Sequence, residues 1–145
     1  MLGIAISEAG QIYVAGANQM SGMSEMVLFT CNLTNQDCYD STQWTSIMPD
    51  FVTSDEYWVD GRGSANAQAV SAYGDVAVVV GNYKASTKGG WAIMTRDSGQ
   101  TWEDLTDDLK ALLPDEDRVP KLYDVHVHAD GSVLIVGEQL FKYSL

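Results

Sequence analysis

The sequence contains one short pattern three times: an apolar run, a turn with glycine, a second apolar run and a closing glycine. Residues 4–16 align without gaps to residues 125–137, and residues 70–81 fit with one extra residue after the turn glycine. The closing glycines are Gly16, Gly81 and Gly137. Each copy predicts a hairpin of two largely buried strands. Such internal repetition constrains the fold more than any other feature of the chain.

Further strands are expected after each hairpin. The third strands are expected at residues 26–30, 91–95 and 140–144, and the fourth at residues 43–48 and 101–105. Thr30 and Thr95 each lie 14 residues after a closing glycine, which aligns the two third strands on these threonines. Repeats of four short antiparallel strands predict an all-β chain built from β-propeller blades. The alternative is an ordinary β-sandwich whose segments resemble one another by chance.

The repeats also predict the organisation of the domain. We expect a single partial propeller over residues 1–145, with blades at about residues 1–48, 64–106 and 121–145. The third blade lacks its outer strand, so the chain holds about 2.75 four-stranded antiparallel meanders. Fewer than three blades cannot close the ring that protects propeller edges. We therefore expect either part of a longer propeller or a homodimer that forms a six-bladed ring.

Composition excludes two classes of partner. The 145 residues include 8 basic and 20 acidic side chains, which gives a formal net charge of −12. A surface this acidic repels nucleic acid and anionic lipid, so neither is an expected partner. No apolar run approaches the roughly 20 residues that span a bilayer, so no membrane insertion is expected. The first ten residues show no signal peptide, and the charge does not identify a compartment.

The turn between the third and fourth strands of the second repeat carries a motif, Thr-Arg-Asp-Ser-Gly-Gln-Thr-Trp, at residues 95–102. The Asp can accept hydrogen bonds from the turn, the Gly tolerates a positive φ, and the Trp can bury its ring under the hairpin. The segment matches the Asp-box pattern Ser/Thr-x-Asp-x-Gly-x-Thr-Trp at every defined position: Thr95, Asp97, Gly99, Thr101 and Trp102.

Through this motif and the repeats, the chain resembles the Asp-box (BNR repeat) β-propeller families. These include sialidases, sortilin-like receptors, xyloglucanases and photosystem assembly factors. The resemblance implies an architecture rather than a reaction, because in these families the box is a folding device on a turn. It implies a structural role for the box residues and no cofactor.

The same turn of the first repeat is enlarged. It takes 14 residues from Thr30 to Trp44, where the complete box takes 7 from Thr95 to Trp102. Both cysteines of the chain, Cys31 and Cys38, lie in the insertion. A disulfide between them would hold the enlarged turn and would favour an extracytoplasmic or secreted location. The alternative is two free thiols in a mobile loop.

Loops at the end opposite the box are the expected ligand site, because closed β architectures commonly bind ligands at such ends. This end holds six of the eight basic residues, within residues 17–25, 49–63, 82–90 and 107–121. Aromatic rings stack on sugars, and Arg or Asp bonds to hydroxyls and carboxylates. The candidate ligand-binding residues are Tyr57, Trp58, Asp60, Arg62, Tyr83, Lys84 and Arg118. The alternative is that the aromatic rings pack between blades and the charges are solvated.

The chain by itself is expected to be a binding module rather than an enzyme, with a glycan or a protein as ligand. Sialidases place three arginines around the substrate carboxylate, and this chain has three, but Arg96 lies inside the box at the wrong end. No catalytic residue is therefore predicted. Two alternatives are a fragment or subunit of a sialidase- or xyloglucanase-type glycoside hydrolase, and a structural assembly factor.

Two histidines were considered as metal ligands. His126 and His128 alternate along an expected strand, so they project to one face. The sequence places no carboxylate or cysteine beside them as a further ligand, so no metal site is predicted. Both histidines are expected to pack or to line the channel of the propeller.

Overall fold

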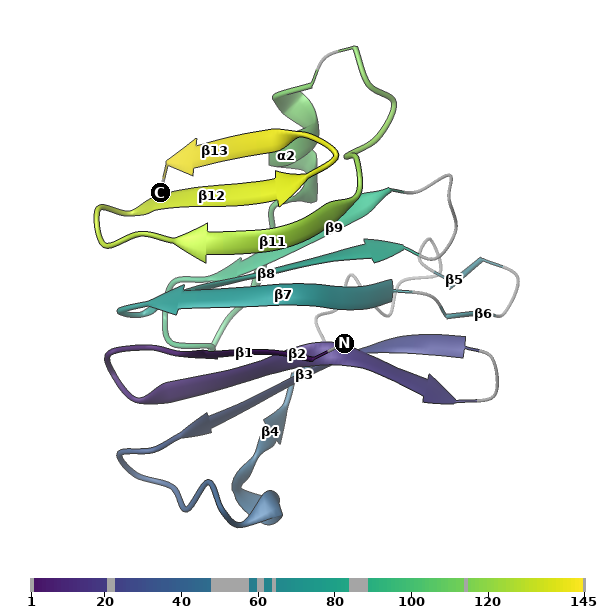
Figure 1. The fold of residues 1–145 in the computed structure, drawn as a ribbon. Coiled ribbons are helices and arrows are strands. Elements are labelled where there is room, and N and C mark those ends of the chain that lie inside the picture. Colours follow the sequence, from purple (N-terminus) through teal and green to yellow (C-terminus); the bar gives the residue numbers. More distant parts are fainter. Residues whose placement is uncertain are drawn as a thin grey trace.

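The computed structural model describes residues 2–20, 23–47, 58–59, 62–63, 65–83, 89–113 and 115–144. Three antiparallel sheets dominate it (Figure 1). The first sheet contains β1 (Leu2–Ile6), β2 (Gln11–Met20), β3 (Met23–Asn32) and β4 (Thr45–Ser46). The second contains β7 (Ala65–Tyr73), β8 (Val76–Tyr83), β9 (Gly90–Thr95) and β10 (Glu103–Asp104). The third contains β11 (Leu122–Val127), β12 (Ser132–Gly137) and β13 (Leu140–Ser144).

Three short elements complete the described part of the chain: a two-stranded hairpin of β5 (Trp58–Val59) and β6 (Arg62–Gly63), the 3-10 turn η1 (Ser41–Gln43) and the helix α2 (Thr106–Ala111). No helix in the described ranges is both long and apolar enough to span a bilayer. Within each large sheet, strands that follow one another in the chain are hydrogen-bonded neighbours. The predicted all-β meanders are therefore confirmed.

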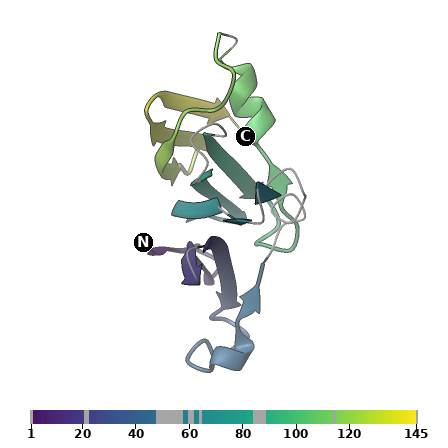
Figure 2. The ribbon, with the colours of Figure 1, turned by 90° about the vertical axis from the view of Figure 1, so that its right-hand side faces the viewer.

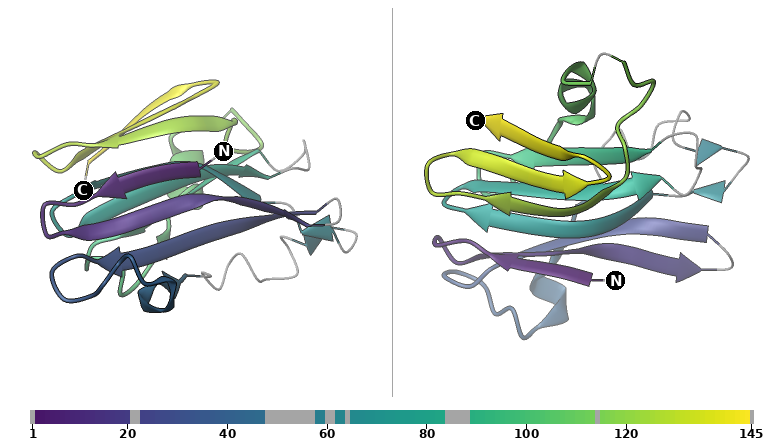
Figure 3. Two further views of the ribbon diagram at one scale, coloured as in Figure 1. Left: turned by 60° about the horizontal axis from the view of Figure 1, so that its bottom comes forward. Right: turned by 45° about the horizontal axis from the view of Figure 1, so that its top comes forward.

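The three sheets stack face to face in chain order, with the second sheet in the middle (Figures 1 and 3). One core lies between the first and second sheets and includes Tyr13, Leu28, Val79, Trp91 and Ile93. Another lies between the second and third sheets and includes Val78, Val80, Met94, Val133 and Ile135. Successive β8 residues point to opposite faces, and both faces are covered. A strand buried on both sides needs a continuous apolar run, which is why Val76–Val80 does not alternate with polar residues.

At the closing glycines of the second and third repeats, a neighbouring segment of backbone lies too close to leave room for a side chain. A Cβ at Gly81 would overlap the carbonyl oxygen of Asn66 and the ring of Trp91, and one at Gly137 would overlap the carbonyl oxygen of Lys121. The pairing of β7 with β8 shifts just beyond Ala67↔Gly81, and that of β11 with β12 shifts beyond Leu122↔Gly137. Each glycine thus makes room for a β-bulge in the first strand of its sheet, β7 or β11.

The third strands are offset by one residue from the alignment that equal spacing predicts. Gly16 lies opposite Val27, whereas Gly81 lies opposite Trp91, so the chain between these paired positions is one residue longer in the first sheet. Thr95 lies opposite Ala77, and the equivalent position opposite Ile12 is Cys31. The alignment of Thr30 with Thr95 is therefore wrong. Because side chains alternate along a strand, this offset puts the two threonines on opposite faces.

Candidate functional sites at the two ends of the sheets

The connections of the sheets gather at two ends (Figure 1). The turns β1–β2, β7–β8 and β11–β12 lie at one end together with residues 96–102, and we call this the turn end. The β5–β6 strands, the facing ends of β2 and β3 and the β12–β13 turn lie at the other end, which we call the loop end. Figure 2, turned by 90°, keeps the three sheets separate and in the same order. Because ligands reach a stack of sheets through such ends, functional groups are expected at either of them.

A dense set of hydrogen bonds organises residues 95–101 at the turn end. Asp97 Oδ1 accepts from the Thr101 N–H at 2.8 Å and from Thr95 Oγ1 at 2.7 Å, while Asp97 Oδ2 accepts from Thr101 Oγ1 at 2.6 Å. The Gly99 N–H donates to Thr95 Oγ1 at 2.9 Å. Ser98 and Gly99 take φ values of +58° and +90°. A turn with consecutive positive φ values favours Gly at one of them, as the motif supplies.

This hairpin also joins the second sheet to the first. The Trp102 ring meets the Tyr13 ring edge-on, with centroids 6.1 Å apart and planes at 85°. A Cβ at Gly99 would lie 3.3 Å from Tyr13 Cε1. Tyr13 is fully buried, and burial together with the charges of Asp75 and Asp97 raises its pKa. Within the described residues its hydroxyl has no hydrogen-bond partner, so its main role here is packing.

Asp97→Asn is expected to destabilise the chain at neutral pH. Hydrogen bonds from the side chain and backbone of Thr101, and from Thr95, lower the pKa of Asp97 from 3.8 to about 2. A depressed pKa stabilises the fold above the unfolded-state pKa, and this stabilisation is lost as pH falls through the folded-state value. Urea midpoints should therefore differ between wild type and variant at pH 7 and converge between about pH 4 and pH 2. A difference that does not change with pH would contradict a role for the carboxylate charge.

A disulfide occupies the corresponding turn of the first sheet. Cys31 and Cys38 are bonded, with Cα atoms 5.9 Å apart. Cys31 stands at the position that Thr95 holds in the second sheet, so a covalent link replaces the hydrogen-bonded start of that turn. The indole Nε1 of Trp44 donates to the Cys38 carbonyl at 3.0 Å, and Asp40 Oδ1 accepts from the Thr42 N–H at 2.9 Å. The enlarged turn is thus held by different chemistry.

The double variant Cys31→Ala/Cys38→Ala is expected to unfold more easily than wild type by about 2 kcal/mol. The bond closes a short ring, with a sequence separation of 7, and rings of this size restrict the unfolded chain by roughly that amount. Urea denaturation under non-reducing conditions measures the difference, and adding reductant to wild type should reproduce it. If reductant leaves the wild-type midpoint unchanged, the bond does not contribute to stability.

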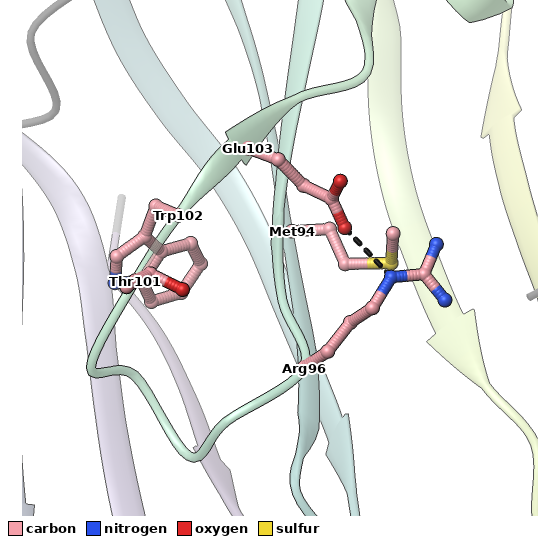
Figure 4. Close-up of a pocket in the computed structure, with 5 residues that line it drawn as sticks. All are labelled: Met94, Arg96, Thr101, Trp102 and Glu103. Atoms are coloured by element: carbon pink, nitrogen blue, oxygen red, sulfur yellow. Dashed lines mark hydrogen bonds and ion pairs between the residues drawn. The ribbon is translucent and has the colours of Figure 1, made fainter.

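A hollow of about 270 Å³ lies beside the box hairpin, lined by Met94, Arg96, Thr101, Trp102 and Glu103 (Figure 4). Arg96 Nε and Glu103 Oε1 are 2.7 Å apart, and both side chains are about half exposed. The ion pair links the residue that follows β9 to β10, and the terminal guanidinium nitrogens point away from Glu103 (Figure 4). The sequence assigned Thr101 and Trp102 to the box motif and did not predict the hollow.

The loop end contains part of the predicted ligand site. Trp58 and Arg62 lie on the same hairpin, which pairs Trp58 with Gly63 and Val59 with Arg62. Tyr57, Asp60 and Lys84 lie outside the described residues. Arg118 is exposed on the connection that leads to β11. Tyr83 differs from these, since it is only 7% exposed and belongs to the core between the first and second sheets.

Asn82 at the loop end has a structural role that the sequence did not predict. It is almost fully buried; its Nδ2 donates to the Leu122 carbonyl at 2.7 Å and its Oδ1 accepts from the Leu122 N–H at 2.8 Å. These paired bonds fasten the second sheet to the start of β11. The available signal was a lone amide directly after the closing glycine, Gly81, in an otherwise apolar strand.

The two histidines lie on the face of β11 opposite Val125 and Val127, which pack against the second sheet. Both are exposed, and their ring centroids are 4.4 Å apart. Within the described ranges, no group of three or more potential metal ligands forms around them. Because both side chains are exposed, neither histidine packs in a core, and that part of the prediction is wrong.

Comparison with known proteins identifies the fold. No protein-family model matches the sequence, and no curated protein matches it. A solved structure described as "YCF48 bound to D1 peptide" aligns with 97% of this chain at a TM-score of 0.59 and 14% identity. That protein is a β-propeller, so the chain has the fold of a partial β-propeller, with each of its three sheets forming a blade. The chain spans only 36% of the length of the protein that it matches.

Proposed function

We propose that this chain is part of a noncatalytic β-propeller that binds an extended segment of a protein partner at its loop end. The observation that carries the proposal is the similar solved propeller, which is described as bound to a peptide. Propellers present loops and strand ends to their ligands, and a short extended segment fits such a surface without a deep cavity. An assembly or scaffolding role is compatible with this mode of binding.

The loop end carries most of the basic side chains of the chain. The segments assigned to it, residues 17–25, 49–63, 82–90 and 107–121, hold six of the eight basic residues and ten of the twenty acidic residues, so they contribute −4 to the formal net charge of −12. Among the described residues, Lys110, Arg118 and Lys121 are exposed. We infer that carboxylates of a bound segment pair with individual arginines at this end, with Arg62 and Arg118 as the main charged contacts.

We also infer that the chain belongs with the Asp-box propellers. The hydrogen bonds that Asp97 and Thr95 make within the turn are those that a box needs to fix its backbone. The box then positions the second blade against the first through Trp102 and Tyr13. On this proposal the turn end is structural and the loop end binds the partner.

Trp58→Ala and Arg62→Ala test the binding site. Peptides selected from a display library against wild type should bind each variant at least about tenfold more weakly, as truncated aromatic or arginine anchors usually cost over 1.4 kcal/mol. The matched controls are Tyr39→Ala, which is fully exposed in the disulfide turn, and Lys142→Ala on β13; both should bind like wild type. Equal binding by all four variants would refute the site.

A glycan is the second candidate ligand, because Trp58 and Arg62 share one hairpin and such pairs recognise sugars. A glycan array distinguishes the two candidates. If glycans bind saturably, Trp58→Ala abolishes this binding and no selected peptide binds, the ligand is a glycan rather than a protein segment.

A further inference from the structure

Two of the three sheets have a β-bulge at the same place in their first strand. On β7 the extra residue is Gln68, which directly follows the partner of Gly81. On β11 the extra residue is Tyr123, which directly follows the partner of Gly137. The pairing of β1 with β2, by contrast, is regular. A bulge changes the direction of a side chain, and bulges are frequent beside binding sites.

The side chains of the two bulge residues belong to neither core. Ala67 lies in the core between the first and second sheets, and Ala69 packs against the core between the second and third. Gln68 stands between these two alanines and is partly buried. Tyr123 follows the buried Leu122 and is 51% exposed. Within the described residues, neither the amide of Gln68 nor the hydroxyl of Tyr123 makes a hydrogen bond, so both keep their capacity to bind a ligand.

Gln68 and Tyr123 stand at nearly the same level on neighbouring strands. β7 and β11 pack against each other and run in the same direction, toward the turn end (Figures 1 and 3). The Val127 N–H donates to Ser71 Oγ at 3.0 Å, and these two residues are 56 positions apart in the sequence. Gln68 and Tyr123 are 55 positions apart, so their levels differ by one residue, about 3.3 Å along a strand. The two bulges therefore form one surface, in the half of the strands nearer the loop end.

The backbone that carries Tyr123 is fixed in place. Asn82 of the second sheet donates to the carbonyl of Leu122 and accepts from its N–H, and Leu122 directly precedes Tyr123. A side chain on such a backbone loses little freedom when a ligand binds, which favours affinity.

This surface adjoins the loop end. Arg62 precedes Gln68 by six residues, and an extended chain advances at most about 3.6 Å per residue, so their Cα atoms are at most about 22 Å apart. Arg118 precedes Tyr123 by five residues, which limits that distance to about 18 Å. An extended segment of about seven residues therefore reaches from either arginine to the bulges. Such a segment presents a main-chain N–H and C=O at almost every residue.

We propose that Gln68 and Tyr123 bind the main chain of the extended segment whose carboxylates pair with Arg62 and Arg118. This inference rests on the proposed function of the loop end. A carboxamide both donates and accepts hydrogen bonds, so Gln68 matches the N–H and C=O of a peptide whatever its side chains are. The ring of Tyr123 packs on the segment while its hydroxyl bonds a second peptide group. The arginines thus provide selectivity for charge, and the bulges provide affinity for an extended backbone.

The experiment measures the affinity of the peptides selected against wild type for four variants. Gln68→Ala should weaken every peptide by a similar factor, about fivefold, because a main-chain contact does not depend on the peptide sequence. Tyr123→Ala should weaken them at least about tenfold. The matched controls are Gln100→Ala in the box turn and Tyr39→Ala in the disulfide turn; both residues are exposed, and both variants should bind like wild type. Equal urea midpoints for wild type and the two bulge variants establish that these variants are folded.

Methylation of single main-chain nitrogens in one selected peptide identifies the bond to Gln68. At one position, methylation should weaken binding to wild type about fivefold and leave binding to Gln68→Ala unchanged, because that variant has already lost the bond. The effect of methylation on the free peptide is the same for both proteins and cancels. If each methylation weakens both proteins equally, Gln68 does not bind the main chain.

The outcomes separate this inference from the proposed function. If Trp58→Ala and Arg62→Ala weaken the peptides while Gln68→Ala and Tyr123→Ala bind like wild type, the inference is wrong and the loop-end site stands. If no peptide binds saturably, or only glycans bind, the proposed function is wrong and the inference is wrong with it. If Gln68→Ala weakens some peptides and leaves others unchanged, Gln68 contacts side chains, which contradicts recognition of the main chain.

Discussion

Trp91→Ala should destabilise the chain by about 3–5 kcal/mol, the largest effect we expect from any single substitution. Trp91 is fully buried and contributes one of the largest side chains of the core between the first and second sheets. It lies directly opposite Gly81, whose missing side chain makes room for the indole ring. Removing the ring leaves a cavity that two rigid sheets cannot close. Urea denaturation followed by far-ultraviolet circular dichroism measures the loss.

Trp91→Phe is the matched control. The indole Nε1 has no hydrogen-bond partner within the described residues, so phenylalanine removes an unsatisfied donor while it keeps an aromatic ring. The loss should stay below about 2 kcal/mol. If the phenylalanine variant is as unstable as the alanine variant, cavity formation is not the cause.

Gly81→Ala should destabilise the chain by about 2–3 kcal/mol, although alanine suits a strand better than glycine does. The added methyl group would overlap both the Asn66 carbonyl oxygen and the Trp91 ring. The backbone oxygen cannot move without breaking the bulged pairing of β7 with β8. Overpacking against backbone is costly because no side-chain rotation relieves it. Thermal and urea unfolding measure the change.

Gly3→Ala is the control for this prediction. A Cβ at Gly3 would lie 3.3 Å from the Val70 nitrogen and 3.4 Å from Val70 Cγ1, which is tight but without overlap. The expected change is within about 1 kcal/mol of zero. Equal losses at Gly3 and Gly81 would show that loss of backbone freedom matters more than the close approach.

The repeat made much of the fold predictable. Alternation and glycine spacing located the hairpins, because each buried strand and each turn has a local chemical requirement. The offset of Thr30 was not predictable from spacing. The segment from Gly16 to its partner Val27 is one residue longer than the segment from Gly81 to its partner Trp91, and nothing in the sequence of a strand marks which residues pair. Tyr83 illustrates another limit. The sequence does not distinguish a Tyr at a strand end that contacts a ligand from one that packs in the core, because its ring is apolar and its hydroxyl is polar.

The candidate site was only partly predictable for a related reason. The box motif predicted the turn, whose hydrogen bonds are all local in sequence. The hollow beside Arg96 is lined by residues 94–103 of one hairpin, but it depends on the directions that their side chains take in the folded structure, and the bonds of Asn82 join residues 40 apart. Contacts of this kind leave no pattern within a single segment.

The hydrogen-exchange footprint of a bound peptide selected against the chain tests the central claim most directly. The claim is that the loop end recognises a protein segment while the turn end holds the blades together. The account predicts slowed exchange at residues 58–63 and 118–121 and no change at residues 95–102. Protection at residues 95–102 without any change at residues 58–63 and 118–121 would contradict it.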